Sequence, residues 1–584
     1  MRPLRILLAP GAFKETLSPS AAADAMEAGL RSVDPSIEIR RAPLADGGDG
    51  TLEAFHALRG GRFEVAVVTG PLGEPVRARF LMLENGNTAV IEMAESSGLR
   101  LVSPDRRNPW VTTTRGLGEL IRAALDLGAR KIIVGLGGSA TVDGGAGMAQ
   151  ALGIRLLDAG GRDLPPGGGA LAQLARIDPS GREPRLNGIE IVTLTDVRAP
   201  LLGPGGAARA FGPQKGADPA MVGRLEESLA HYAGVLDAHA GRPVRNLPGA
   251  GAAGGLGAGL ASLLGAKLVA GAEVFILEAG LIPSIVWADA VMTGEGRFDA
   301  TTLQGKAPGA LLEMCGGSGT SGLVVCGSSD RPDAGAYPGT AAMATLLEDA
   351  GTPERAMRDA ARYADRAAAR ALRRFLAVGG GPKPAIPLPP FVLASASTGR
   401  AELLRAWHYS TTLSPTGAPE ATPSSSDDLR KVLLDNSRAK ARTWLRQNPR
   451  YRLERGRLVA ADTLTFCDGR IQGKAPDRAA ALDVLRSVRG KPQQVLSAVW
   501  VVPLDRTDAG GAGGIAEATV RLRPELTDDD LRAYLATGKG DGKAGSFAID
   551  PAGDPFFELL EGEIDTVIGL SRRVLDGLLG KFQA

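Results

Sequence analysis

Two strand-to-helix beginnings, separated by a run of glycine and proline, are the feature that most constrains how this chain folds. The first opens with RILLAPGAFKETLSPS at Arg5, and the second opens with PFVLASASTGRAELL at Pro390. Between them lies GGGPKPAIPLPP, residues 379–390. Glycine and proline interrupt regular structure, and a proline-dense run forms a semi-stiff spacer. We therefore predict two enzymes in one polypeptide, at 1–378 and 391–584, joined by a linker at 379–390.

Length and charge narrow the class of protein. The chain has 584 residues, more than one hydrophobic core normally serves. Its 67 lysines and arginines nearly balance its 65 aspartates and glutamates, so we expect no nucleic acid and no membrane among its partners. No uncharged apolar segment is long enough to cross a bilayer, and the first residues do not resemble a secretion signal. With three cysteines at no metal-ligand spacing, we expect a cytoplasmic protein, and a homodimer is compatible with the sequence.

In residues 1–378, short runs of valine, isoleucine and leucine alternate with alanine-rich helical stretches. LGELIRAALDLGA, from Leu117, is followed by RKIIVGLGG, and IEIVTLTDV begins at Ile189. This alternation predicts an α/β fold with a parallel sheet core whose strands are buried on both faces. Such sheets bind ligands beyond the carboxyl ends of their strands, so we expect the functional residues there.

Four segments at such places carry chemistry. ADGGDGT places Asp46 and Asp49 around a pair of glycines. GLGGSATVDGGAGM, from Gly135, offers backbone N–H groups that can cradle an anion at a helix N-terminus. The segment after IEIVTLT presents Asp196 and then Lys215 among glycines. The fourth segment, TGEGRFDATTLQGK, contains Glu295, Arg297, Asp299 and Lys306.

Each segment alone has a structural explanation, because glycine-rich turns are common and a carboxylate in a turn often caps a helix. Together they predict a phosphoryl transferase. Such an enzyme needs cations and N–H groups for phosphates, carboxylates for Mg²⁺, and one carboxylate to take a hydroxyl proton. The chain has no GxxxxGK[ST] sequence and no HRD or DFG set, so we exclude a P-loop enzyme and a protein kinase.

The segments resemble the class I glycerate kinase family in content and in order. The matching blocks are PGAFKETLSPS, LADGGDGT, ESSGLRLVSPDRRNPWVTTTRGLGELI, GLGGSATVDGGAGM, TDVRAPLLGPGGAARAFGPQKGA and TGEGRFDATTLQGK. They cover nearly all of residues 1–378. The resemblance implies a two-lobed α/β kinase with its site between lobes that can be discontinuous in sequence. It also implies ATP-dependent, Mg²⁺-dependent phosphorylation of D-glycerate, usually at the 2-position.

By motif position, the resemblance assigns roles to single residues. Asp196 is implied as the general base on the glycerate hydroxyl. Gly137, Gly138 and Ser139 are implied as a turn that holds phosphate or the glycerate carboxylate. The implied anion contacts are Lys14, Ser18, Arg107 and Lys215. Further candidates are Asp46, Asp49, Glu295, Arg297, Asp299 and Lys306.

Some positions depart from the family pattern. Gly11 and Ala12 stand where the family usually has a carboxylate and a hydroxyl, and Val142 replaces a usual asparagine. Thr301 stands near a usual glutamine. These changes bear on substrate choice more than on reaction class, so a kinase for another small hydroxy acid is the alternative.

Residues 391–584 begin with a strand that breaks into a serine-rich turn. Ser395, Ser397 and Arg400 lie at that turn, where hydroxyls, N–H groups and a guanidinium suit a polyphosphate. Asp462, predicted at the end of a strand that starts at Leu458, is a candidate to bind Mg²⁺ or orient water. Further positive charge comes from Lys440, Lys474 and Lys543. The structural alternative is that Ser397 caps a helix and the lysines are solvated.

This second part resembles the Maf family of nucleoside-triphosphate pyrophosphatases. The matching blocks are LASASTGRAELL, NSRAKA, VAADTLTFCDGRIQGKAPD and GKAGSFAID. The resemblance implies an elongated α/β domain with a deep cleft, and Mg²⁺-dependent hydrolysis of nucleoside triphosphates to monophosphate and pyrophosphate. By motif position it implies Arg400 and Lys474 as phosphate contacts, Asp462 as metal ligand or base, and Glu420 as a second carboxylate.

Departures keep the second activity open. Gln493 occupies a usual histidine, and Ala475 is inserted between Lys474 and Pro476. Asp550 stands where members acting on dTTP and UTP usually carry glutamine. The sequence thus predicts a bifunctional enzyme acting on glycerate, ATP and nucleoside triphosphates. A nucleotide-sensing or oligomerisation module without turnover is the alternative for its second part.

Overall fold

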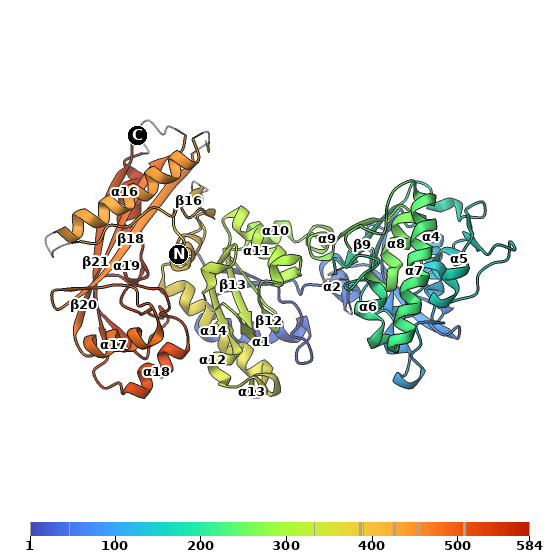
Figure 1. The fold of residues 1–584 in the computed structure, drawn as a ribbon, viewed down its shortest axis with the longest axis horizontal. Helices are drawn as coiled ribbons and strands as arrows, with labels where there is room; N and C mark the ends of the chain where they lie inside the picture. Colours follow the sequence, from blue (N-terminus) through green and yellow to red (C-terminus); the bar gives the residue numbers. More distant parts are fainter. Residues whose placement is uncertain are drawn as a thin grey trace. The chain divides into compact units, whose positions relative to one another are not determined.

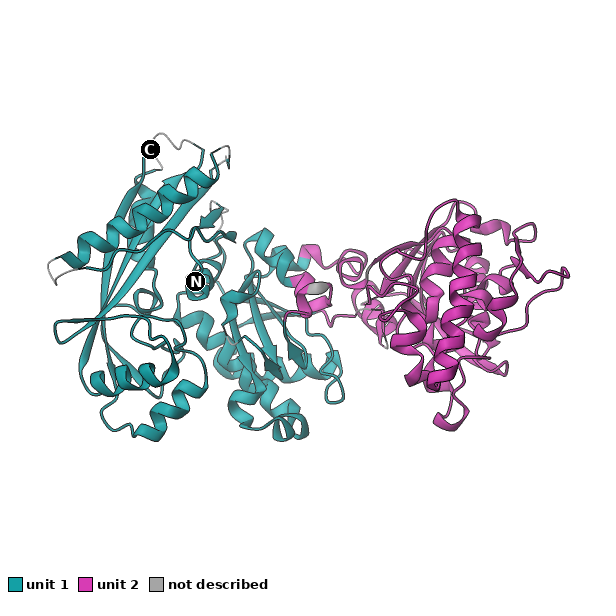
Figure 2. Ribbon diagram, viewed as in Figure 1, with its two compact units in different colours: residues 1–41, 284–299, 312–584 teal, residues 42–283, 300–311 magenta. Residues whose placement is uncertain are grey.

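The computed structural model describes residues 2–45, 47–48, 50–195, 197–331, 333–384, 388, 390–423, 428–449, 451, 453, 455–505 and 510–582. The chain divides into two compact units (Figure 2). One unit is Ala42–Pro283 with Ala300–Leu311, which we call the six-stranded lobe. The other is Met1–Arg41, Ser284–Asp299 and Leu312–Ala584. Within it we distinguish the five-stranded lobe, whose chain ends at 378, from the C-terminal region, residues 390–582.

Buried apolar runs form the sheet of the five-stranded lobe. Ile6, Leu7 and Leu8 of one interior strand are fully shielded from solvent, as expected for a strand covered on both faces. All neighbouring strands in this sheet are parallel, which confirms the expected parallel core. The strand order is β15 (Thr340–Thr345), β13 (Ser321–Cys326), β11 (Ala290–Thr293), β1 (Arg5–Leu8) and β2 (Glu38–Arg41).

Two long helices of this lobe, α1 (Pro19–Val33) and α14 (Ala360–Ala377), pack closely against each other. A Cβ atom on Gly29 of α1 would lie 2.1 Å from the carbonyl oxygen of Asp365 in α14, so the close approach requires glycine. Ser18 begins α1 by accepting a hydrogen bond from the N–H of Ala21 at 3.2 Å. The smaller elements are α12 (Leu346–Ala350), α13 (Pro353–Arg358), β12 (Arg297–Phe298), β14 (Ser328–Ser329) and the 3-10 turn η7 (Ala334–Ala336).

The six-stranded lobe has a mixed sheet. Its strand order is β10 (Lys267–Ala270), β9 (Glu190–Thr195), β6 (Lys131–Gly135), β5 (Thr88–Glu92), β4 (Pro75–Met82) and β3 (Arg62–Thr69). The strands from β10 to β5 are parallel, and β4 and β3 continue the sheet antiparallel. The carboxyl ends of β6 and β9 therefore meet at one edge of the sheet.

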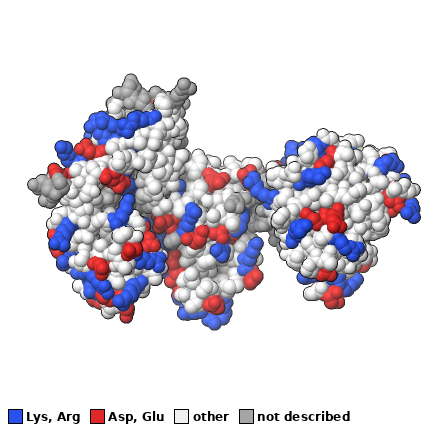
Figure 3. Space-filling view, in the orientation of Figure 1, with Lys and Arg blue, Asp and Glu red and all other residues white. Residues whose placement is uncertain are grey.

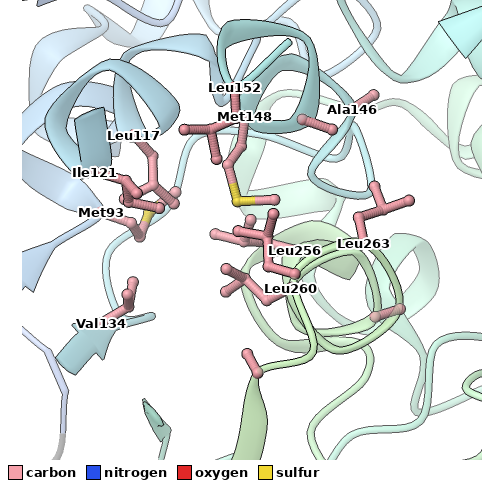
Figure 4. Close-up of a cluster of buried hydrophobic side chains, with 14 of the residues drawn as sticks. Met93, Leu117, Ile121, Val134, Ala146, Met148, Leu152, Leu256, Leu260 and Leu263 are labelled. Atoms are coloured by element: carbon pink, nitrogen blue, oxygen red, sulfur yellow. The ribbon is translucent and has the colours of Figure 1, made fainter. Parts of the chain in front are cut away.

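Helices α4 (Arg115–Asp126), α5 (Ala146–Ala151) and α8 (Ala252–Leu263) enclose the core of this lobe (Figure 4). Leu117 and Ile121 from α4 point into the same cluster as Met148 from α5 and Leu256 and Leu260 from α8. The other helices are α2 (Thr51–Arg59), α3 (Ala94–Ser97), α6 (Ala207–Phe211), α7 (Pro219–Ala240) and α9 (Gly271–Glu278). The remaining short elements are η1 (Leu99–Leu101), η2 (Pro104–Arg106), β7 (Arg155–Leu157), η3 (Gly168–Gln173), β8 (Arg176–Asp178), η4 (Pro184–Leu186), η5 (Pro213–Lys215) and η6 (Thr302–Gln304). Helices α10 (Ile282–Trp287) and α11 (Ala307–Ser318) each have residues in both units.

The C-terminal region is built on a second α/β layer (Figure 1). Its strands follow the order β17 (Thr411–Leu413), β16 (Phe391–Leu393), β18 (Arg457–Cys467), β20 (Pro492–Pro503), β21 (Ala512–Leu522) and β22 (Phe557–Glu561), and β19 (Arg470–Gln472) pairs with β18. Strand β16 is parallel to both neighbours, and the other pairs are antiparallel. The helices are α15 (Thr398–Ala406), α16 (Leu429–Gln447), α17 (Arg478–Val488), α18 (Asp528–Ala536), α19 (Ile564–Ile568) and α20 (Arg572–Gly580).

The placement of Asp462 at the end of a strand is wrong. Strand β18 continues five residues further, to Cys467, because β20 pairs with it as far as Phe466. Strand β16 is shorter and ends opposite Val459. Asp462 therefore lies on β18 just beyond the end of β16, next to the turn that follows β16.

Charges of both signs are mixed on the face of the molecule in Figure 3. Figure 3 shows blue and red atoms interspersed, with one denser blue band along α16. Arg438, Arg442 and Arg446 make this band, since residues four apart share one helix face. In the part of the chain that the structure describes, no helix combines the length and apolar character needed to cross a membrane.

Helix α15 joins the C-terminal region to the five-stranded lobe. It packs against β15 and η7, and one hydrophobic cluster contains Leu372 of the lobe together with Trp407 and Val459 of the C-terminal region. The Trp407 indole N–H donates to the carbonyl oxygen of Val378 at 2.6 Å. This core joins residues from before and after 379–390. A domain boundary in that stretch, and the separate folding of residues 1–378 and 391–584, therefore stay predictions.

Buried Arg405 of α15 makes the polar part of the same contact. Its Nη1 donates to the carbonyl oxygens of Gly335, Tyr337 and Thr340 at 3.1, 2.7 and 3.3 Å. Burial lowers the Arg405 pKa to about 10, and the nearby Glu402 carboxylate partly offsets that shift. The guanidinium therefore stays charged at neutral pH and is held by backbone carbonyls.

We expect Arg405→Ala to destabilise this unit, because the carbonyl oxygens lose their donor while they stay buried. An unpaired buried polar group costs about 1–3 kcal/mol, so the free energy of unfolding in urea should fall by about 2–3 kcal/mol. Exposed Arg442→Ala is the control and should change it by less than about 0.5 kcal/mol. Equal effects of the two substitutions would show that the Arg405 contact contributes nothing to stability.

Candidate active sites

Three backbone loops pack directly on one another at the ends of β6 and β9 in the six-stranded lobe. The N–H of Gly137 donates to the carbonyl oxygen of Gly47 at 2.8 Å, and that of Leu136 donates to Leu194 at 3.0 Å. A Cβ on Gly137 would lie 2.4 Å from the Cα of Gly48, so this approach needs glycine. The loops that flank Asp46, Asp49 and Asp196 therefore converge, although these three residues themselves lie outside the described residues.

Lys215 reaches into the same loops from η5. The side chain is 2% exposed, and its Nζ donates to the hydroxyl of Ser139 at 2.7 Å and to the carbonyl oxygen of Thr141 at 2.8 Å. Burial lowers the Lys215 pKa to about 7, and the nearby Asp143 carboxylate opposes that shift. A bound anion would stabilise the charged form, so this ammonium is suited to hold one.

Asp143 orders the loop that leads from β6 into α5. Its carboxylate accepts from the N–H and the hydroxyl of Thr114, both at 2.8 Å, and from the N–H groups of Gly145 and Gly147 at 3.1 and 3.3 Å. Burial raises the Asp143 pKa despite these bonds. Asp143 lies within the block GLGGSATVDGGAGM but was not among the predicted site residues; its signal in the sequence is one carboxylate inside a loop of small residues.

Arg107 lies beside Lys215. A Cβ on Gly216 would be 2.3 Å from the carbonyl oxygen of Arg107, and Arg107 Nη1 donates to Gln214 at 3.4 Å. Arg107 Nε and Thr141 Oγ1 are buried without a hydrogen-bond partner among the described residues. Two polar atoms without partners beside Lys215 and the Gly137–Ser139 turn fit an anion that is held there.

Gly138 and Ser139 are fixed from the other side by the loop after α3. Gly138 accepts from the N–H of Leu99 at 2.8 Å, and Ser139 forms a β-bridge with Gly98. The structure thus brings Arg107, Lys215 and the turn together. Lys306 belongs to the second stretch of this lobe, where its carbonyl oxygen accepts from the N–H of Ala310 in α11 at 3.1 Å.

The other candidates of the first enzyme lie in the five-stranded lobe. The Lys14 loop runs beside the Glu295 loop: Gly11 donates to the carbonyl oxygen of Gly294 at 2.9 Å, and a Cβ on Gly296 would be 3.6 Å from the Lys14 nitrogen. Lys14 and Ser18 are both exposed, and Ser18 also caps α1. Arg297 pairs with Asp299 at 3.1 Å, so these two charges neutralise each other.

In the C-terminal region, two carboxylates converge on one lysine. Lys440 Nζ of α16 lies 2.8 Å from Asp462 Oδ1 and 2.8 Å from Glu420 Oε1. Asn436, one turn earlier on α16, donates to Asp462 Oδ2 at 2.9 Å. Asn436 lies in the block NSRAKA but was not among the predicted site residues. The side chain of Asp462 is 10% exposed and that of Glu420 is 45% exposed, so the cluster opens to solvent at Glu420.

Arg400 is the buried anchor of this site. Its guanidinium donates to the hydroxyls of Ser395 at 2.8 Å and Thr463 at 3.0 Å, and to the carbonyl oxygens of Ala461 at 2.8 Å and Gly569 at 2.9 Å. Burial lowers the Arg400 pKa, against the attraction of the nearby carboxylates. These bonds join the turn after β16 to β18 and to the loop after α19. The Ser397 hydroxyl accepts from the N–H of Arg400 at 3.5 Å and begins α15.

The two other lysines are more exposed. Lys474 Nζ lies 3.9 Å from Glu420 Oε2, and Lys474 forms a β-bridge with Ala544. Lys543, next to Ala544, lies 3.9 Å from Asp333 of the five-stranded lobe. The structure therefore groups Asp462, Lys440, Glu420 and Lys474, with Arg400 linked to them through β18.

The donor set of Asp462 and Glu420 fits Mg²⁺, because two carboxylates already converge on a cationic ammonium and Mg²⁺ prefers oxygen ligands. Within the described residues, no group of three or more histidine, cysteine, aspartate or glutamate side chains is arranged to hold a metal ion. An ion at Asp462 and Glu420 would take its other ligands from substrate phosphates, as Mg²⁺ commonly does.

Comparison with known proteins matches this architecture. Residues 6–376 match the glycerate kinase family, and residues 390–582 match the family described as Maf-like protein. Glycerate kinase of Bacillus subtilis (strain 168) is 48% identical over 367 residues, which cover 62% of this chain and 96% of that protein. Glycerate 2-kinase of Escherichia coli (strain K12) is 49% identical over 305 residues, which cover 52% of this chain and 80% of that protein.

A crystal structure assigned to glycerate kinase 2 from Salmonella typhimurium LT2 superposes with a TM-score of 0.54 and 41% identity. It covers 63% of this chain and 97% of the other. The fold of residues 6–376 is thus that of a small-molecule kinase. The chain belongs to the glycerate kinase family, and a Maf-like segment follows its kinase part.

The lowered pKa of Lys215 predicts a pH-dependent stability. The folded-state pKa of about 7 lies below the ordinary value of 10.5, so the unfolded chain binds more protons between these two pH values. The free energy of unfolding of the wild type should therefore rise with pH in that window, relative to Lys215→Met, by up to about 1.4 kcal/mol per pH unit. Denaturant unfolding of both proteins at several pH values measures the slope.

Lys267→Met, at a lysine whose side chain is 69% exposed in the same lobe, is the control and should leave the pH slope unchanged. A wild type and a Lys215→Met variant with parallel pH profiles would disprove the burial effect.

Proposed function

We propose that the kinase part transfers the γ-phosphoryl group of ATP to the 2-hydroxyl of D-glycerate, with Mg²⁺. The observation that carries this proposal is the cluster of buried Lys215, half-buried Arg107 and the Gly137–Ser139 turn. The chain is 48% identical to a glycerate kinase over 96% of that protein and 62% of this chain. Similarity to a glycerate 2-kinase supports the 2-position. The product would be 2-phosphoglycerate.

The chemistry needs three groups, and the chain offers each. Lys215 and Arg107 present positive charge and N–H donors to an anion, which lowers the cost of bringing two anionic substrates together. Asp196 directly follows β9 and is the proposed base that takes the proton of the glycerate hydroxyl. Mg²⁺ bound with ATP would neutralise charge on the phosphates.

Asp196→Asn tests the proposed base. Asparagine keeps the shape but takes no proton, so kcat should fall by about 10²–10⁴-fold while ATP binding stays close to normal. A coupled assay of ADP release and a direct ATP-binding measurement separate the two effects. Asp163→Asn, at an exposed carboxylate in the same lobe, is the control.

Turnover by Asp196→Asn within a few-fold of the wild type would rule out Asp196 as the base. A panel of small hydroxy acids in the same assay addresses the alternative raised by Gly11 and Ala12. A better substrate than D-glycerate in that panel would replace the proposed substrate but keep the kinase.

We also propose that the Maf-like segment hydrolyses nucleoside triphosphates to monophosphate and pyrophosphate. The observation behind this proposal is the convergence of Asp462 and Glu420 on Lys440 beside the Arg400 turn. In the proposed step, water attacks the α-phosphorus, the bond to the bridging oxygen breaks, and pyrophosphate leaves. Asp462 and Glu420 would hold Mg²⁺, which supplies charge neutralisation at the phosphates when bound.

The residues around the carboxylates have separable tasks in this scheme. Lys440 and Asn436 fix the orientation of Asp462, and Arg400 holds the Ser395 turn in place. Lys474 and Lys543 are exposed enough to meet the phosphates. A segment that only binds nucleotide, or only assembles subunits, would need no such oriented carboxylate; both stay as alternatives.

Asp462→Asn should abolish hydrolysis while nucleotide still binds, because the lysines remain. We expect at least about a 10²-fold loss of kcat, as for other lost acid–base or charge-stabilising groups. Product analysis over a panel of nucleoside triphosphates, with pyrophosphate and orthophosphate measured separately, is the readout. Asp468→Asn, at an exposed turn after the same strand, is the control.

Orthophosphate as the first product would exclude cleavage between the α and β phosphates. Nucleotide binding by the wild type without any hydrolysis would establish the sensing alternative in place of the enzyme.

A further inference from the structure

A long irregular loop of the C-terminal region, residues 539–550, is held by the five-stranded lobe. It lies between the end of α18 and the start of β22 and belongs to neither element. Gly542, Gly545 and Ser546 have φ values of 70°, 72° and 58°, which is left-handed backbone, and turn hydrogen bonds join Lys543 to Gly540 and Ser546 to Lys543. Ordering such an irregular loop costs conformational entropy, which contacts with the rest of the chain offset.

The strongest of these contacts joins Asp550, at the end of the loop, to Arg374 of α14. Arg374 Nη2 lies 2.6 Å from Asp550 Oδ2, and Arg374 Nε lies 3.2 Å from both carboxylate oxygens. The side chains are 14% and 8% exposed. Burial by itself would raise the Asp550 pKa, but the hydrogen bonds and charge of Arg374 lower it. The carboxylate is therefore ionised and fully engaged.

Arg374 is itself held in place from within its own lobe. Its Nη2 lies 2.6 Å from Glu348 Oε2, and its Nη1 donates to the carbonyl oxygen of Met343 at 2.5 Å. Contacts within the five-stranded lobe thus fix the guanidinium, and Asp550 of the C-terminal region binds it in that position. A fixed donor fork matches a carboxylate in one orientation, so it sets the position of Asp550.

A second contact holds the other half of the loop. Asp333, just before η7, accepts from the hydroxyl of Thr398 at 3.1 Å and lies 3.9 Å from Lys543 Nζ. Thr398 is the first residue of α15, next to Ser397. One carboxylate of the five-stranded lobe therefore contacts both the serine-rich turn and the loop that bears Lys543.

The loop in turn positions Lys474. The N–H of Gly545 donates to the carbonyl oxygens of Gln472 and Gly473 at 3.2 and 3.1 Å, and Ala544 forms a bridge with Lys474. Both exposed lysines of the site, Lys474 and Lys543, thus depend on where this loop lies. Tyr534 of α18 holds the loop at Ala548 through two hydrogen bonds of its hydroxyl, and Arg374 and Asp333, which belong to the kinase part of the sequence, hold it at Asp550 and Lys543.

We propose that the five-stranded lobe completes the nucleotide site of the Maf-like segment, with Arg374 acting through Asp550 as the principal positioning residue and Asp333 as the second. This inference rests on the proposed nucleotide function. The ion pair also explains why residue 550 is an aspartate, because its carboxylate binds Arg374 rather than a ligand. Phosphate contacts by Lys474 and Lys543 then depend on a residue outside the C-terminal region.

Arg374→Met, Asp550→Asn and the double variant test this proposal in the full chain. Each single substitution should raise the KM for the best nucleoside triphosphate of the panel on the order of tenfold, with kcat within about threefold. The double variant should be no worse than either single one, because both remove the same contact. Arg374→Lys should raise the KM less than Arg374→Met does, since lysine keeps the positive charge but lacks the paired N–H donors of a guanidinium.

Arg370→Met is the matched control. Arg370 lies one turn earlier on α14 and pairs with Asp349, which is also in the five-stranded lobe. A purely structural role for Arg374 predicts that both variants lose thermal stability and that both raise the nucleotide KM to the same extent. Positioning predicts a changed KM in Arg374→Met alone, with kinase activity preserved in both. Affinity for an α,β-methylene nucleoside triphosphate should follow the KM.

The outcomes separate this inference from the function on which it rests. A wild type that neither binds nor hydrolyses any nucleotide would overturn both. A wild type that hydrolyses nucleotide, with Arg374→Met unchanged in KM and in analogue affinity, would overturn only the positioning role. Additive losses in the double variant would also overturn it, since Arg374 and Asp550 would then act separately.

Discussion

The burial of helix α15 is the constraint on which the largest compact unit depends. Six residues of this nine-residue helix are buried, and two of them are arginines. A buried guanidinium is tolerated only when its charge and its N–H groups are matched by acceptors. Arg400 finds them in the C-terminal sheet and its turns, and Arg405 finds them in carbonyl oxygens of the five-stranded lobe. One short helix must satisfy the acceptors of both arginines. The site around Arg400 and the contact between the C-terminal region and the five-stranded lobe therefore cannot move independently.

The six-stranded lobe holds a positive charge, that of Lys215, away from water among its loops. Glycines let the Gly47–Gly48 loop pack backbone to backbone against Gly137 after β6 and against Leu194 of β9. Lys215 enters this region with two acceptors and with Asp143 nearby, and burial brings its pKa close to neutral. Such an ammonium gains most from a bound anion, because the anion repays the cost of removing the charge from water. This is the electrostatic logic expected of a phosphoryl-transfer site.

The same lobe that carries the Lys14 and Glu295 loops also supports the C-terminal region. Strand β12 follows the Glu295 loop and pairs with β14, and Tyr337 packs edge-to-face on Phe298 at 4.8 Å between ring centroids. Tyr337 and Gly335 then offer their carbonyl oxygens to Arg405. A continuous set of packed residues therefore connects a candidate kinase loop to helix α15. The C-terminal region and the five-stranded lobe thus share a hydrophobic core and a buried ion pair, in addition to the chain at 379–390.

Local features of the fold were predictable from the sequence. Helix α4 and strands β6 and β9 form in the stretches where the sequence alternates between alanine-rich and branched apolar residues, since such patterns depend on adjacent residues. The parallel core and the glycine-rich loops at strand ends followed from the same local patterns. The motif blocks also identified the family, because they are contiguous stretches of chain. The roles of Asp46, Asp49 and Asp196 stay predictions, as these residues lie outside the described part of the chain.

What the sequence by itself determined is therefore the set of elements, their chemistry and the family. Tertiary structure alone decided which side chains meet. Asp462 lies within β18 because β20 extends that strand, and Asp550 pairs with Arg374 across 176 residues. Asp143, Asn436 and Asp333 became visible only through their partners in distant loops. The physical reason is that helix and strand patterns depend on neighbours along the chain, whereas buried charges are governed by whichever acceptors the folded core brings within hydrogen-bond distance.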